Sequence, residues 1–188
     1  MNSYHPTIWR TCRVLANAKR LLCLKTVLEQ PGSTVGDIAA CVRISENQAS
    51  EHLRAIQARG LIQASRESRW VHYVPLPDTL VASARPLLAA MRRVLLVEGK
   101  TEKEIICTLT AFTHPRRLAI LQYLQKTNRA SADNLAASTQ VSLPALSRHL
   151  SKLAARRLIS CDDHYWRLSR CSGRLNKTLL ALLNAGEA

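Results

Sequence analysis

Two stretches of the chain share one pattern of serine, histidine and apolar residues: Ile44-Ser45-Glu46-Asn47-Gln48-Ala49-Ser50-Glu51-His52-Leu53 and Val141-Ser142-Leu143-Pro144-Ala145-Leu146-Ser147-Arg148-His149-Leu150. They lie inside a longer ungapped match, in which residues 20–62 correspond to residues 117–159 at a constant offset of 97 (Arg20 with Arg117). A repeat of this length indicates tandem domains rather than a solenoid of short units. The sequence therefore predicts two copies of one small unit.

Both copies also end alike, in His72-Tyr73-Val74-Pro75-Leu76 and His164-Tyr165-Trp166-Arg167-Leu168, where the offset falls to 92 (His72 with His164). On this alignment copy two lacks five residues between Ile159 and His164. The predicted domains are residues 1–98 and residues 99–188, and each includes the helix that follows its hairpin. Domains of this size fall near the small end of the usual range.

Copy one reads as three helices followed by two strands. An apolar stripe over 18–28 ends at Pro31-Gly32, Thr34 with Asp37 and Ser45 with Gln48 form capping boxes, and Gly60 stops the third helix. Two strands, 61–64 and 70–76, flank a polar turn over 65–69. This order predicts a mainly α fold with a small β-hairpin.

Copy two repeats the order. Pro115 lies in the first turn of its first helix, Ser131 and Ser142 cap the next two helices, and strands at 158–161 and 165–168 form a tighter hairpin. Between the copies and at the C-terminus, stripes of leucine at helical spacing (87–95 and 175–183) predict helices available for packing one copy against the other. Pro86 must start the first of these helices or kink it.

Helix, short helix, tight turn, helix and hairpin form a winged helix-turn-helix, and here the pattern resembles a known family. Both quoted stretches, with the helix openings at 18–21 and 114–118, are similar to the recognition helices of the ArsR (arsenic-repressor-type) regulators. That family's members bind DNA as homodimers that pack their first and last helices around a two-fold axis. The resemblance implies α+β tandem winged domains that form a pseudo-dimer within one chain.

The recognition helices should read double-stranded DNA, because a helix fits the major groove and its N-terminal residues reach base edges. Ser50 and Ser147 lie at the shoulder, where phosphate or base is in reach. The basic wing of copy one suits phosphate or the minor groove. The candidate DNA-binding residues are Asn47, Gln48, Ser50, Glu51, His52, Arg54, Arg66, Arg69, Pro144, Ala145, Ser147, Arg148, His149, Ser151 and Lys152.

Two details remain open at the level of sequence. His52 and His149 either touch DNA or hold the turn by a hydrogen bond to the backbone. The wing of copy two carries Asp162 and Asp163, which would face phosphates unfavourably, so we expect it to stay off the DNA backbone.

Charge supports a polyanionic partner. The formal net charge is +14 and the pI is near 10.2, a balance that favours nucleic acid first and an anionic membrane surface second. No apolar run is long enough to span a bilayer, and the N-terminus lacks the pattern of a signal peptide. Six scattered cysteines without C-x-x-C indicate buried thiols in a reducing cytoplasm. A DNA-binding regulator is expected to associate with the nucleoid there. Cys161 and Cys171 are candidate exposed thiols.

No metal or cofactor is expected. The family's Cys-x-Cys would fall near Thr34 and Gly36, and near Ser131 and Asp133, and neither copy has a cysteine there. Cys41 is interpreted as a core residue. The chain has no glycine-rich phosphate loop, no nucleophile elbow and only 13 acidic residues, so catalysis is not predicted.

Three alternatives to a sequence-specific regulator, expected to be a repressor, stay open. Winged helices can dock proteins instead of DNA, charge alone would allow a nonspecific nucleic-acid-binding protein, and an enzyme is the least supported. The operator, any inducer, and whether two chains pair into a further homodimer lie beyond the sequence.

Overall fold

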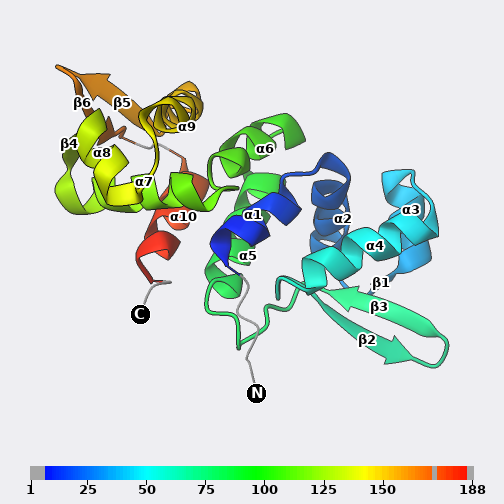
Figure 1. The fold of residues 1–188 in the computed structure, drawn as a ribbon. Helices are drawn as coiled ribbons and strands as arrows, with labels where there is room; N and C mark the ends of the chain where they lie inside the picture. The colour runs from blue at the N-terminus through cyan, green and yellow to red at the C-terminus, as the bar shows by residue number, and fades with distance from the viewer. Residues whose placement is uncertain (1–6, 171–172, 186–188) are drawn as a thin grey trace.

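The computed structural model describes residues 7–170 and 173–185, which form two winged units joined by a helical centre (Figure 1). The first unit and the segment after it contain α1 (Ile8–Leu15), α2 (Ala18–Glu29), β1 (Ser33–Thr34), α3 (Val35–Val42), α4 (Glu46–Gln57), β2 (Gln63–Glu67), β3 (Trp70–Val74), α5 (Ala84–Arg92) and the π-helical turn η1 (Arg93–Val97). The second contains α6 (Glu102–Ala111), α7 (Pro115–Thr127), β4 (Arg129–Ser131), α8 (Ala132–Thr139), α9 (Leu143–Ala155), β5 (Ile159–Asp162), β6 (Tyr165–Leu168) and α10 (Arg174–Ala185).

Most helix starts lie where the sequence predicts them. Thr34 with Asp37 and Ser45 with Gln48 form complete capping boxes, and the Ser131 side chain accepts from the Asn134 amide. Ser142 occupies the N-cap position of α9 without a side-chain hydrogen bond. Pro86 lies in the first turn of α5 and therefore starts that helix rather than kinking it.

Each unit holds a three-stranded antiparallel sheet, in the orders β1-β3-β2 and β4-β6-β5. The short strands β1 and β4 were not predicted, because two or three residues between helices carry no periodicity. The first wing also turns more tightly than predicted. Strand β2 extends to Glu67, so the turn contains only Ser68 and Arg69.

Strand register corrects the alignment of the two hairpins. Thr34 pairs with His72, and Ser131, at the offset of 97, pairs with Tyr165. His72 therefore corresponds to Tyr165, an offset of 93, and the second hairpin is four residues shorter rather than five. His164, which the sequence comparison matched to His72, lies instead in the turn with a positive φ of 65°.

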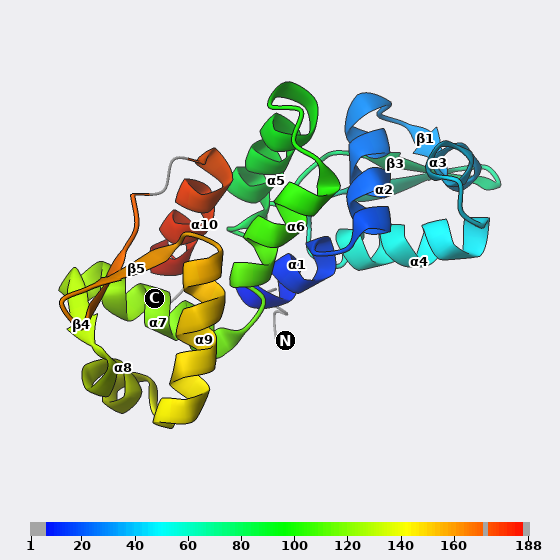
Figure 2. The same cartoon turned by 90° about the horizontal axis from the view of Figure 1, so that it is seen from above.

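The two units pack through corresponding helices. Helix α1 contacts α6, and α5 contacts α10 (Figure 2). The buried apolar side chains of both units form one continuous core, which includes Cys12 and Leu87 from the first and Leu109 and Leu179 from the second. The leucine stripes after each hairpin therefore do pack one unit against the other, as predicted.

Arg20 and Arg117 correspond in the sequence match, and each links two consecutive helices. Arg20 links α2 to α1, and Arg117 links α7 to α6. The Arg20 guanidinium donates to the Val14 carbonyl at 3.2 Å. That of Arg117, which is buried, donates to the Ala111 and Thr110 carbonyls at 2.8 and 2.7 Å. Cations at the carbonyl end of a helix stabilise it, so these arginines have a structural role.

The prediction of buried thiols is wrong for part of the chain. Cys12 and Cys23 are buried, and burial raises the pKa of Cys23 to about 11. Cys41 and Cys107 are exposed, which corrects the assignment of Cys41 to the core. Cys161 is exposed, as expected, and Cys171 lies outside the described residues. Among the residues that the structure describes, no helix is long and apolar enough to cross a membrane.

Candidate nucleic-acid interface

Helix α4 presents a polar face to solvent. Its inward stripe, Ala49, Leu53 and Ile56, is fully buried. The predicted base-reading residues Asn47, Gln48, Glu51 and Arg54 are all exposed, whereas Ser50 is half-buried. The side-chain oxygen Oε1 of Gln48 accepts from the Ser45 backbone amide at 3.2 Å. The side-chain nitrogen Nε2 of Gln48 therefore remains able to donate to a base edge. The sequence thus predicted the exposure of this face correctly.

Helix α9 is built in the same way, with Leu146, Leu150 and Leu153 buried. Pro144, Ser147, Arg148, Ser151 and Lys152 are exposed. Ala145 departs from the prediction of an outward position, because it is half-buried and packs against the core. The exposed face of α9 therefore offers two cations and two hydroxyls, where α4 offers two amides, one carboxylate and one cation.

The two wings differ in chemistry. In the first, Arg66 lies on β2 and Arg69 in the turn, and both are exposed. The Arg69 guanidinium lies over the Trp70 ring, with its Cζ 5.0 Å from the ring centroid, and Trp70 is 52% exposed. Sequence reasoning treated Trp70 only as the start of a strand. An aromatic residue directly after an arginine in a polar turn was the signal for this basic, stacked wing tip.

The tip of the second wing carries Asp162 and Asp163, both exposed. Asp162 is paired with Arg167 across the hairpin at 3.3 Å, which offsets part of its charge. This wing presents no basic tip, in agreement with the expected difference between the wings.

The two histidines of the recognition helices are half-buried, and their Nδ1 atoms are buried without a hydrogen-bond partner in the described part of the chain. The alternative in which they hold the turn by a backbone bond from Nδ1 is therefore not met. Burial, followed by the charge of Arg20, lowers the pKa of His52. Burial, followed by His114, lowers the pKa of His149.

The His149 ring contacts the His114 ring, with the ring centroids 4.8 Å apart and the planes tilted by 44°. His114 is the N-cap of α7, where its Nδ1 accepts from the Arg116 amide at 3.2 Å. Burial and the adjacent arginines lower the pKa of His114 as well. Asn17, at the offset of 97, caps α2 in the same way by accepting from the Arg20 amide.

The positions that the metal-binding family members use for cysteine do structural work here. Of the positions named above, Thr34 donates to Asp37 at the start of α3, and Ser131 caps α8. Within residues 7–170 and 173–185, no three histidine, cysteine or acidic side chains gather in a group that could hold a metal ion.

In the comparison with known proteins, one family model matches part of the second unit. Residues 114–160 match the helix-turn-helix of the "Bacterial regulatory protein, arsR family". The match runs from the N-cap of α7 through α9 and into β5. This part of the chain is therefore similar to the helix-turn-helix of that family.

No curated protein matches the chain. A solved structure, human N-acetylserotonin methyltransferase in complex with SAM, matches at 16% identity and a TM-score of 0.34. The match covers 80% of this chain and 39% of that protein. A likeness at this level carries no information about function.

Proposed function

We propose that this chain is a sequence-specific DNA-binding transcriptional regulator, acting as a repressor on nucleoid DNA in the cytoplasm. The observation that carries the proposal is the coincidence of the arsR-family match with α9 and its exposed Arg148, Ser151 and Lys152. Arginine and lysine at these positions bond guanine edges or phosphates. The net charge of +14 supports attraction of the duplex from a distance. The proposal assigns no catalytic role, metal or cofactor.

The proposal extends to the first unit, so that residues 1–98 and 99–188 act as tandem winged domains. Identical residues at a constant offset, the same strand order in both sheets, and left-handed backbone at the matched pairs Arg43 with Gln140 and Gly60 with Arg157 support it. The packing of α1 on α6 and of α5 on α10 supports a pseudo-dimer. In that arrangement α4 and α9 would enter major grooves about one helical turn, roughly 34 Å, apart.

Two other functions make different predictions. A protein-docking scaffold would use exposed apolar residues such as Leu76 and Leu80, which are 52% and 80% exposed, and would bind DNA weakly. A nonspecific nucleic-acid-binding protein would bind every duplex alike. The polar groups of α4 and α9 favour sequence-specific reading over both.

The test is footprinting of the protein on the DNA upstream of its own gene, followed by titrations from about 50 to 200 mM salt. With 6–10 phosphate contacts, affinity should fall by about 10³–10⁵ over this range. Arg66→Ala on the first wing should reduce the salt slope by about 1. Arg85→Ala removes the same charge from the exposed side of α5 and should leave the footprint unchanged. A flat salt response, or equal affinity for all sequences, would exclude the proposed function.

A further inference from the structure

A basic recess lies on the seam between the two units, where α5 and η1 meet α10. One part of it, about 350 Å³, is lined by Pro86, Ala89, Ala90, Arg92, Arg93, Val97, Arg174 and Thr178. A second part, about 550 Å³, is lined by Arg93, Glu98, Lys100, Gly173, Arg174 and Lys177. Arg93 and Arg174 line both parts, so the two form one groove with these guanidinium groups at its middle. None of these residues belongs to the DNA-reading surface described above.

The charge of the groove is unbalanced. Five of its side chains are basic and one, Glu98, is acidic. Glu98 pairs with Arg93 at 3.3 Å and with Lys100 at 3.5 Å. Arg174 and Lys177 have no ion pair within the described residues. The groove therefore holds cationic groups for which the described part of the chain supplies no counter-charge.

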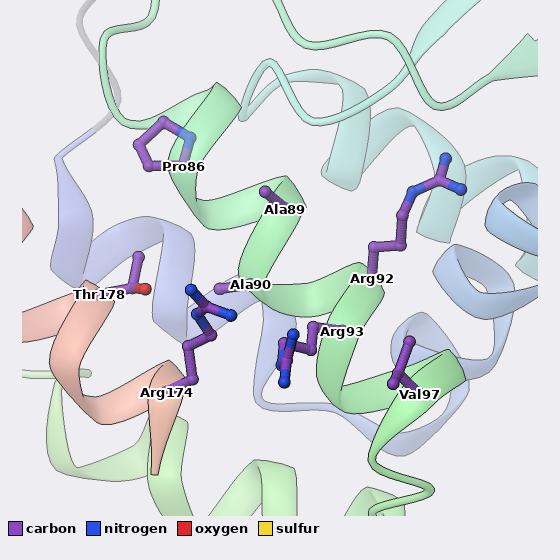
Figure 3. Close-up of a pocket in the computed structure, with 8 residues that line it drawn as sticks. All are labelled: Pro86, Ala89, Ala90, Arg92, Arg93, Val97, Arg174 and Thr178. Carbon is purple, nitrogen blue, oxygen red and sulfur yellow. The ribbon is translucent and has the colours of Figure 1, made fainter.

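The side chains converge from both units. Figure 3 shows the Arg174 side chain, from α10, and that of Arg93, from η1, in the space between these helices, whereas Arg92 extends away from it. The N-terminal end of α10, which begins at Arg174, adds the partial positive charge of a helix start. Two guanidinium groups facing one space suit a carboxylate or phosphate, which arginine binds through two parallel hydrogen bonds.

Part of the α5 and η1 wall of the groove is apolar. Pro86, Ala89 and Val97 line the smaller part, and Val97 is 71% exposed. The small alanine side chains leave the space open beside the helix. Arg93 and Val97 are the two ends of η1, a π-helical turn of the kind that occurs frequently at functional sites.

From these observations we propose that the groove binds a small organic anion, with its carboxylate or phosphate between Arg93 and Arg174 and an apolar body against Pro86, Ala89 and Val97. A nucleic-acid backbone fits this location poorly. In Figure 2 the beginnings of α10 and of the recognition helix α9 lie at opposite ends of the second unit.

The position on the seam implies a regulatory effect, and this part rests on the proposed DNA-binding function. One wall of the groove belongs to α5 and η1 and the other to α10, so an occupant contacts both units at once. A ligand that fits one relative placement of the units better than another shifts the protein toward that placement. Because α4 and α9 are carried by different units, the anion changes affinity for DNA.

Binding is measured first without DNA, by calorimetric titration of the full chain with phenyl phosphate, benzoate and the neutral analogue benzamide. Both anions should bind, and benzamide should bind at least about tenfold more weakly, because hydrogen bonds to charged groups are worth more than neutral ones. Comparison of the two anions shows whether phosphate or carboxylate is preferred. Benzamide binding as tightly as the anions would overturn the site.

The variant Arg174→Gln, at an exposed position, should raise the dissociation constant of the anions by about ten- to a hundredfold. Arg85→Gln on the same seam helix, α5, removes an equal charge outside the groove and should bind them like the unaltered chain. Equal weakening in both variants would reduce the effect to net charge and overturn the proposal.

The regulatory step is tested by adding the tighter anion to the protein–DNA complex. The DNA dissociation constant should change severalfold in the unaltered chain and not in Arg174→Gln. Anion binding with an unchanged DNA affinity would overturn the coupling while leaving the site. Absence of any DNA binding would exclude the proposed function, and the titrations without DNA would still decide whether the groove binds anions.

Discussion

The two units present different chemistry on similar frameworks. The first has amides and a carboxylate on α4 and a longer wing with Arg66, Arg69 and Trp70, whereas the second has cations on α9 and a shorter wing tipped by Asp162 and Asp163. The buried positions beneath these surfaces correspond, as Leu53 and Leu150 do. Similar cores with dissimilar exposed faces indicate that the two units share their packing and differ in the groups that their surfaces offer for binding.

The largest effect should come from the shared core. Leu53→Ala and Leu150→Ala each remove a buried leucine from a recognition helix and should cost about 2–5 kcal/mol of unfolding free energy. Because the core is continuous across the seam, we expect each variant to lower one common thermal transition. Calorimetry that resolves two transitions, with each variant lowering only one, would show instead that the units fold independently.

The two recognition helices, α4 and α9, should prefer different bases in the DNA. Gln48→Ala and Arg148→Ala each remove one exposed polar side chain, one from each helix, and each should relax base preference by about 1–3 kcal/mol. Since the two faces carry different donors, the affected bases should lie in different half-sites. Binding to a library of single-base operator changes measures this. Superimposable loss profiles would contradict a division of labour between the units.

The turn after each recognition helix offers a matched pair of backbone positions. Gly60 and Arg157 both adopt positive φ, at 71° and 55°. Only Gly60 is also crowded, since a Cβ there would lie 3.0 Å from the side chains of Asp78 and Val81. Gly60→Ala should therefore destabilise the protein by about 1–2 kcal/mol, and Arg157→Gly should stabilise it by up to about 1 kcal/mol.

Denaturant titration of both variants checks these two signs. The contrary result would be a destabilised Arg157→Gly, which would mean that the arginine side chain contributes more than its backbone conformation costs.

The smallest expected effect is a loss of folding stability at acidic pH. The pKa values of His114 and His149 lie below the ordinary histidine value of 6.5 in the folded chain, so the unfolded chain binds more protons. The stability that these groups contribute is present above about pH 6.5 and is lost as pH falls through the lowered folded values. Thermal melts between about pH 7.5 and 5 should show this loss.

His114→Asn is the matched variant for this pH dependence, because Asn17 caps the corresponding helix of the first unit. It should keep the cap, remove the contact with His149 and weaken the dependence of the melting temperature on pH. An unchanged dependence would assign the titration to other groups, His52 among them.

The predictable part of the structure is the part with periodicity and capping chemistry. Leu146, Leu150 and Leu153 at helical spacing, and Thr34 with Asp37, specify their elements locally. The strand β1 was missed because Ser33 and Thr34 become a strand only by pairing with Tyr73 and His72, which are distant in sequence. The groove at the seam was missed for the same reason. Arg93 and Arg174 are brought together by packing, and no local pattern links them.

The register of the two hairpins has a further consequence for engineering. Relative to the first hairpin, the second lacks the equivalents of Arg66 and Glu67 on one strand and of Trp70 and Val71 on the other. Two residues per strand is the smallest change that keeps the same class of ladder pair next to a two-residue turn, because hydrogen-bonded and non-hydrogen-bonded pairs alternate along an antiparallel ladder. The wings of this scaffold therefore differ in length by two cross-strand pairs. Designed grafts should likewise lengthen or shorten a wing by two cross-strand pairs, whereas a single-residue insertion in one strand would require a β-bulge or shift the pairing register.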